Sequence, residues 1–382
     1  MFEMSRVAPL PTTATGRKVG SRPVSGLAAL VVAVAAVGVL VWRPPPPEAA
    51  PTASLLPQAA EVWPNARRAT INAILPDGAQ YQPAHVLDAT ASIGTAPEPG
   101  GGTHLRLLHR ASGGHLRELR RLPTVDEPEF AAIAVDAGRV VWAESTIDAS
   151  GRAHTEMWAA DLAGDRPARR LTADTGQFIY LGSEYDLAVQ DGWLHWAAIS
   201  PGRETDTELR TVSLDGGPVT VEARPGDWEL SRWPYLTSVG SGGPVRLHDV
   251  VARRTTQVAA AADEVVACSP SWCRLLVTAP DGQPQNVLVR PDGGDRQIVA
   301  PGTASPSVVD VAALDRFEVL SEGTAEDPDR SSRVLYLYDV AQRRTVEIAR
   351  GVGTVQSRGG FLWWSTVAGP ETIWHTLDMR TI

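Results

Sequence analysis

A short stretch that recurs along the chain limits what this sequence can fold into. Its clearest form is Gly138-Arg139-Val140-Val141-Trp142. Altered copies stand at residues 192–196, 273–277, 315–319 and 360–364. Most copies begin at a turn residue, and each continues into a short apolar run of the kind found in β-strands.

Each copy is followed by a polar loop and a second β run, and in most units a short turn then leads to a third run. The second runs are Leu105–Arg110, Met157–Asp161, Leu209–Ser213, Val245–Asp249, Val287–Arg290, Val334–Asp339 and Thr372–Thr376. Most of the turns are rich in Gly and Asp, as in β-hairpins. The unit recurs roughly every 44 residues, which matches a four-stranded propeller blade better than any helical repeat.

These units predict an all-β fold, a seven-bladed β-propeller with six blades as the alternative, over about Ala60–Ile382. Seven second runs have only six partner strands, and Ala69–Leu75 stands alone before the first unit. We expect this strand to complete the last blade, because that pairing removes an open sheet edge. Trp142, Trp196 and Trp364 hold equivalent places in their units and are expected to pack between blades.

The N-terminal region predicts one transmembrane helix before the propeller. Residues 1–25 are polar and basic, and Gly26–Trp42 is an uncharged apolar run near the lower length limit for a membrane span. The preceding basic residues place the N-terminus in the cytoplasm and the rest outside, in the plasma membrane. The alternative is a cleaved signal peptide. Residues 43–59, rich in proline, are expected to form a stiff linker.

Composition excludes several classes of function. The formal net charge is -9, which disfavours binding to nucleic acid or to an anionic lipid surface. The eight histidines are scattered, and His195, inside a strand, is expected to be a packing residue. No motif typical of a nucleophile elbow, a dinucleotide loop or a metal site occurs, so we assign no catalytic, cofactor or metal residue and expect no cofactor.

The only two cysteines, Cys268 and Cys273, flank Ser-Pro-Ser-Trp at a turn between two strands. Outside the cell such a pair is expected to be oxidised to a disulfide, and the alternative is two buried free thiols.

The repeat unit, with its Asp/Gly turns and Arg-containing strands, resembles TolB-like β-propellers. The N-terminal apolar run, Glu61-Val62-Trp63-Pro64, Leu75-Pro76-Asp77-Gly78 and Cys268–Arg274 are similar to those of a membrane-anchored actinobacterial group of TolB-like proteins. The strong blade motif of TolB is absent, as is its separate α/β domain. The resemblance therefore implies the fold, and the lipoprotein partner of TolB does not carry over.

The distribution of charge between loops suggests a binding face. If the strands are assigned correctly, one face of the ring carries acidic loops and the opposite face carries arginine-containing turns. The predicted binding face consists of Asp126, Glu127, Glu129, Glu204, Asp206, Glu208, Glu326, Asp327 and Asp329. The alternative is that these are ordinary solvated loops. Loops on a rigid scaffold are where binding residues concentrate.

Two functions remain open from the sequence. The first is a membrane-tethered, extracellular propeller that acts as a scaffold for an unknown protein or cell-wall component, and it is favoured by the lack of a catalytic pattern. The second is an extracellular enzyme acting on glycans, with carboxylates in the central channel. A glycan hydrolase would show two carboxyl groups in one deep pocket, whereas a scaffold would show a shallow face.

Overall fold

The computed structural model describes residues 56–164, 166–239, 244–261, 264–279, 282–299, 304–323, 333–368 and 371–382. The expected cytoplasmic tail, the apolar run and residues 43–55 of the linker lie outside this part, as do Glu326, Asp327 and Asp329. Among the described residues, no helix has the length and apolar character needed to cross a membrane.

Four sheets follow one simple pattern, in which four consecutive strands pair antiparallel with their neighbours in sequence. The first contains β2 (Gln82–Val86), β3 (Ser92–Pro97), β4 (His104–Arg110) and β5 (Leu116–Pro123). The second contains β6 (Glu129–Asp136), β7 (Arg139–Ile147), β8 (Ala153–Asp161) and β9 (Arg169–Thr172). The others contain β15 (Trp228–Leu230), β16 (Tyr235–Ser238), β17 (Arg246–Asp249) and β18 (Arg254–Gln257), and then β19 (Val265–Cys268), β20 (Cys273–Thr278), β21 (Pro284–Val289) and β22 (Gln297–Ile298).

The remaining two sheets depart from this pattern. One has β12 (Trp193–Ser200), β13 (Arg203–Ser213) and β14 (Thr220–Arg224), with both β10 (Gln177–Phe178) and β11 (Ala188–Gln190) paired to β12. The other has seven strands, β23 (Ser305–Pro306), β24 (Phe317–Gly323), β25 (Arg333–Asp339), β26 (Arg344–Arg358), β27 (Phe361–Ala368), β28 (Glu371–Asp378) and β1 (Arg68–Asn72). The first part of β26 pairs with β25 and its last part with β27, so this strand joins two four-stranded groups.

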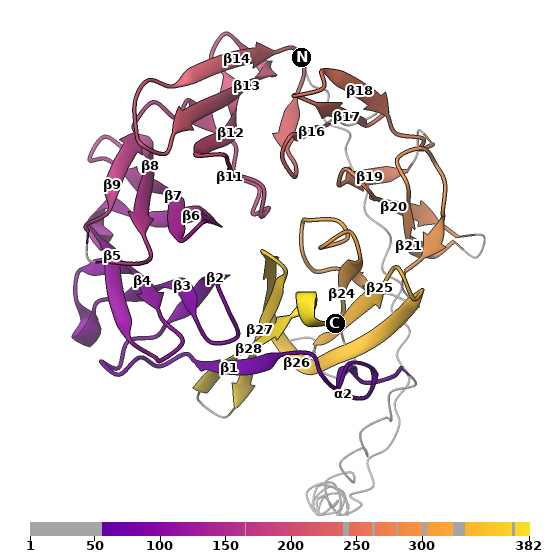
Figure 1. Cartoon of the computed structure of the whole chain (residues 1–382), viewed down its shortest axis with the longest axis horizontal. Helices are drawn as coiled ribbons and strands as arrows, with labels where there is room; N and C mark the ends of the chain where they lie inside the picture. Colours follow the sequence, from indigo (N-terminus) through magenta and orange to yellow (C-terminus); the bar gives the residue numbers. More distant parts are fainter. Residues whose placement is uncertain are drawn as a thin grey trace, which may run out of the picture. The chain divides into compact units, whose positions relative to one another are not determined.

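Within the unit Leu55–Ile382, the sheets follow one another around a ring (Figure 1). Strands β2, β6, β11 and β19 face the middle of the ring, and β5, β9, β14 and β18 lie on its rim. Consecutive four-stranded antiparallel sheets arranged in this way form a β-propeller. The all-β propeller predicted from the repeat is therefore confirmed.

The ring is closed by its N-terminal strand. Strand β1 pairs antiparallel with β28, with Ile71 opposite Trp374, and Figure 1 shows it beside the C-terminal strands. The expectation that the solitary strand completes the last group is confirmed. Contacts begin slightly earlier than Ala60, because Glu347 donates its backbone N–H to the carbonyl of Pro57 just before the short helix α2 (Ala59–Val62).

The core lies between neighbouring sheets. Trp142 and Trp196 are fully buried and Trp364 is 6% exposed, so the predicted packing role of these residues is confirmed. Close packing also explains Gly94 in β3, where a Cβ atom would stand 2.3 Å from the carbonyl oxygen of Gln82.

Candidate functional site

A loop from one sheet enters the middle of the ring. Strands β10 and β11 pair with two different parts of β12. The backbone N–H of Ile179 still donates to the carbonyl of Ala197 in β12, and residues 180–187 then leave the sheet (Figure 1). We call residues 179–187 the plug loop. In this sheet an inner strand is thus divided in two, and the chain between its halves is available for contacts across the ring.

The plug loop is tied to the seven-stranded sheet by hydrogen bonds. Asp310, between β23 and β24, accepts from the Ser183 hydroxyl (2.5 Å) and from the backbone N–H of Glu184 (2.9 Å). Arg358, at the end of β26, donates to the carbonyl oxygens of Ser183 (3.1 Å) and Gly182 (3.2 Å). These bonds hold the loop at its middle.

Two carboxyl groups of the loop complete the arrangement. Glu184 accepts from the backbone N–H of Gly359 (2.6 Å). Asp186 accepts from the backbone N–H of Gly182 (2.8 Å) within the loop itself. Backbone N–H groups are obligatory donors, so each of these carboxylates supplies an acceptor within the fold to a backbone group of the loop or of its neighbour.

Burial raises the pKa values of the carboxyl groups in and around the plug loop. Desolvation raises the pKa of Asp186 to about 6 and that of Glu229, in β15, to about 7. Desolvation also raises the pKa values of Glu184 and Asp310, and the Asp310 charge adds to the effect at Glu184. Such shifts are concentrated at functional sites, although structural clusters show them too.

Three hollows adjoin the plug loop. One, with about 430 Å³ of empty space, lies between Glu229, Asp310, Tyr185 and the residues around Cys268, and we call it the Glu229 cavity. Two wider hollows of about 910 and 790 Å³ share Tyr180, Gln356 and Arg358 in their walls. The loop therefore divides the middle of the ring into separate spaces.

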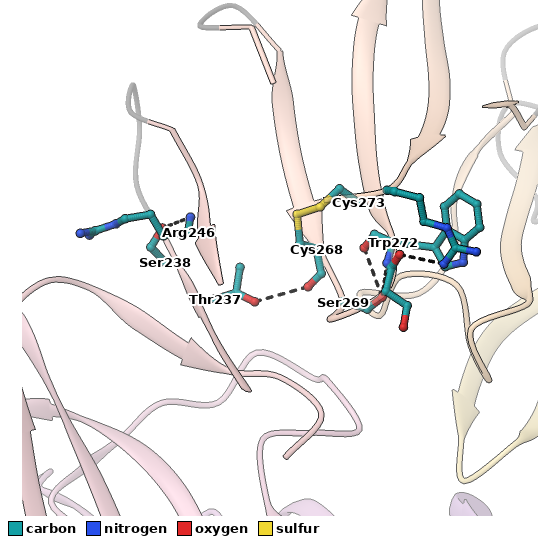
Figure 2. Close-up of a disulfide and its surroundings, with 9 residues drawn as sticks. Thr237, Ser238, Arg246, Cys268, Ser269, Trp272 and Cys273 are labelled. Atoms are coloured by element: carbon teal, nitrogen blue, oxygen red, sulfur yellow. Dashed lines mark hydrogen bonds between the residues drawn. A yellow bond between two sulfur atoms is a disulfide. The ribbon is translucent and has the colours of Figure 1, made fainter. Parts of the chain in front are cut away.

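The disulfide forms one edge of the Glu229 cavity. Cys268, at the end of β19, is bonded to Cys273, at the start of β20, which confirms the predicted pair. Figure 2 shows the bond closing the turn, with the Cys268 carbonyl accepting from the Thr237 hydroxyl of the neighbouring sheet (3.4 Å). Inside the turn, Ser269 accepts from the backbone N–H of Trp272 (3.1 Å). The bond therefore holds a cavity wall that includes Cys268 and Ser269.

The acidic residues predicted as a binding face differ in position and exposure, and Glu129 lines the hollow of about 790 Å³ together with Tyr180 and Arg358. Glu127, Glu129 and Glu204 are exposed, whereas Asp126 and Asp206 are half-buried. Asp206 accepts from the backbone N–H of Gly226 (3.1 Å).

Glu208 differs from the other predicted face residues. Residues 204–208 belong to β13 rather than to a loop, because the polar sequence extends the hairpin with β12. Glu208 is 7% exposed and forms an ion pair with Arg210 (2.7 Å). Its carboxylate is therefore occupied within the fold.

The central groups were not identified from the sequence. Asp310 and Arg358 belong to segments far from the plug loop in sequence, and no local motif links them. The one signal in the sequence was that no continuous apolar β run of the kind expected for an inner strand precedes Trp193, where the plug loop is inserted. Among the described residues, no group of His, Cys, Asp and Glu is arranged to hold a metal ion. His195 packs as expected, stacked on Trp233 at 3.7 Å between ring centroids.

Comparisons with known proteins found similar solved structures but no match in sequence. No family model matches the chain, and no curated protein matches it in sequence. The structure of a putative TolB from Agrobacterium tumefaciens is 13% identical, with a TM-score of 0.39 over 62% of this chain and 84% of that one. TolB from Acinetobacter baumannii is 11% identical, with a TM-score of 0.37 over 75% and 78%. The β-propeller domain of the Trilobed protease from Pyrococcus furiosus is 11% identical, with a TM-score of 0.40 over 63% and 80%.

Proposed function

We propose that this protein is a seven-bladed, membrane-tethered propeller that binds a basic protein or cell-envelope component outside the cell. The observation that supports binding over catalysis is the held plug loop. Asp310, Glu184 and Asp186 each accept hydrogen bonds from backbone N–H groups that fix the loop. These carboxylates stabilise the loop, and the exposed loops of the ring are left to contact a partner.

The apolar run Gly26–Trp42 is proposed as the anchor, with the N-terminus in the cytoplasm and the ring outside. Residues 43–55 would hold the ring away from the membrane. This arrangement, like the resemblance to the membrane-anchored actinobacterial group, is a proposal from the sequence.

The proposed contact surface is the set of exposed acidic residues. Glu127 and Glu204 are exposed, and close to Glu127 the side chain of Val125 is 84% exposed. Exposed acidic groups suit a partner that presents lysine or arginine, and they favour fast association at low salt.

The test uses the full-length protein in detergent to capture material from an envelope extract of the source cell. The double variant Glu127→Lys/Glu204→Lys should lose a stoichiometric partner that the wild type retains. Asp136→Lys/Asp191→Lys is the matched control. It makes the same charge change at two exposed positions, at the turns that precede β7 and β12. Each double variant also alters one residue with a left-handed backbone, Glu127 in the first and Asp191 in the control. Equal recovery of the partner with both variants would reject the acidic surface.

A second candidate function is an enzyme acting on glycans. It is favoured by Glu229 and Asp310, two carboxyl groups with raised pKa values in the walls of one cavity. Glycoside hydrolysis needs both carboxyl groups for chemistry, whereas Asp310 is engaged by the plug loop. Release of reducing sugar from purified cell-wall glycan by the wild type but not by Glu229→Gln would establish this alternative.

A further inference from the structure

The Glu229 cavity is assembled from four separate segments. Its walls come from β15, from the turn between β19 and β20, from residues 309–311 and from the plug loop. Its empty space of about 430 Å³ includes the part that is open to solvent, so the enclosed part has room only for a small chemical group. Because the disulfide and the plug-loop hydrogen bonds fix two of these walls, the cavity is formed before any ligand arrives.

The walls of this cavity carry negative charge. Glu229 stands on one wall and Asp310 on another. The Asp310 carboxylate accepts hydrogen bonds from Ser183 and Glu184. In the described part of the chain, the Glu229 carboxylate accepts no hydrogen bond and forms no ion pair. A half-buried carboxyl group without a donor is costly, and a ligand that brings N–H donors removes that cost.

The rest of the lining is apolar or aromatic. Leu181 and Val309 are 43% and 50% exposed, so both can be reached from solvent, whereas Leu230 in the same lining is buried. Tyr185 adds a ring whose face attracts cations. A carboxylate, an aromatic ring and aliphatic walls together match a cation carried on a short hydrocarbon chain.

We propose that the Glu229 cavity binds an alkylammonium group, with the ammonium at the Glu229 carboxylate beside Tyr185 and the hydrocarbon chain along Leu181 and Val309. A free aliphatic amine and the lysine side chain of a polypeptide both supply this group. The site is separate from the acidic surface proposed above, so either proposal can fail without the other.

The test is isothermal titration of the full-length protein in detergent at pH 7.5 with two probes, cadaverine and acetyl-lysine methylamide. Acetyl-norleucine methylamide is the uncharged control. We expect saturable binding of at least one amine and none of the control. Binding of cadaverine alone identifies a free amine as the ligand, and binding of the blocked lysine alone identifies a side chain. Saturable binding of neither amine overturns the proposal.

A variant assigns the binding to the cavity. Glu229→Gln keeps the shape of the side chain and should weaken amine binding by roughly tenfold or more. The matched control Glu204→Gln removes an exposed acid elsewhere and should leave the affinity unchanged. Equal affinity of both variants and the wild type would place the amine at another site and overturn the proposal.

Proton release on amine binding can be measured with the wild type alone, and it tests the proposal even if Glu229→Gln does not fold. An ammonium at Glu229 favours its ionised form, so binding near pH 6.5 should release protons. Titration in two buffers of different ionisation enthalpy measures this release. Amine binding without proton release near pH 6.5 would contradict a contact with Glu229.

Discussion

At the scale of single residues, acidic side chains in this protein differ by what surrounds them. Asp148, in a hairpin turn, accepts from Ser150 and from His154, and these hydrogen bonds lower its pKa. Glu229 has no such donors and is desolvated, so its pKa rises to about 7. The two carboxyl groups therefore make opposite contributions to the pH dependence of stability.

The Glu229→Gln variant should change that dependence. An acid whose pKa is raised on folding stabilises the protein most below its unfolded pKa, and this contribution is lost as the pH rises through the folded value. For Glu229 the loss runs from about pH 4.5 to about pH 7. The nearby Asp186, Asp227 and Asp310 carboxylates add to the shift, after desolvation.

We therefore expect Glu229→Gln to be more stable than the wild type by about 3 kcal/mol at pH 8 and nearly equal to it at pH 4.5. Urea unfolding of both proteins at the two pH values measures the difference. A difference that is the same at both pH values would show that Glu229 titrates normally.

The buried pair of Glu208 and Arg210 leads to a second prediction. Glu208→Lys places two positive charges together at a site that is 7% exposed, and it should lower the free energy of unfolding by about 3–5 kcal/mol. Glu204→Lys, four residues earlier and exposed, should change it by less than about 0.5 kcal/mol. Urea unfolding compares them, and similar losses for both would mean that the pair does not hold β13.

At the scale of strands, the outer parts of each unit could be predicted from the sequence. Apolar runs and Gly/Asp turns mark strands such as β8 and β13, because both faces of these strands pack or pair in a regular way. The pairing of β1 followed from counting the strands. The inner strands β10 and β11 could not be predicted, because they have only two and three residues and their partners are set by β12.

The central site has no local sequence signal either. Asp310, Arg358 and Glu184 are distant in sequence and meet only because the ring brings their segments together. The disulfide could be predicted, since Cys268 and Cys273 are close in sequence at one turn.

Closure by β1 is the third prediction. Ile71 is fully buried in a cluster with Phe361, Trp363 and Trp374, so Ile71→Ala should cost about 2–5 kcal/mol. Val221→Ala, on the rim strand β14 where the side chain is 43% exposed, is the control and should cost much less. Chemical denaturation measures both, and equal small effects would mean that β1 is dispensable for closure.

At the scale of the whole ring, two connections join parts that are far apart in sequence. Strand β1 pairs with the C-terminal strand β28, and the plug loop joins its own sheet to the seven-stranded one. Long-range pairing of this kind makes the ring one cooperative unit. The preference for binding over catalysis depends on the second connection. If the plug loop were not held, its carboxyl groups would be free to act as catalytic acids or bases.

The most direct test is hydrogen exchange of the backbone amides of residues 179–187 in the full-length protein, read by mass spectrometry. In the wild type we expect this loop to be protected, since the amides of Gly182 and Glu184 are bonded to Asp186 and Asp310. Arg358→Gln should increase its exchange by roughly tenfold or more, while Arg253→Gln, an exposed control, should not. Exchange of the wild-type loop at the rate of an unprotected peptide would contradict the held plug and, with it, the preference for binding over catalysis.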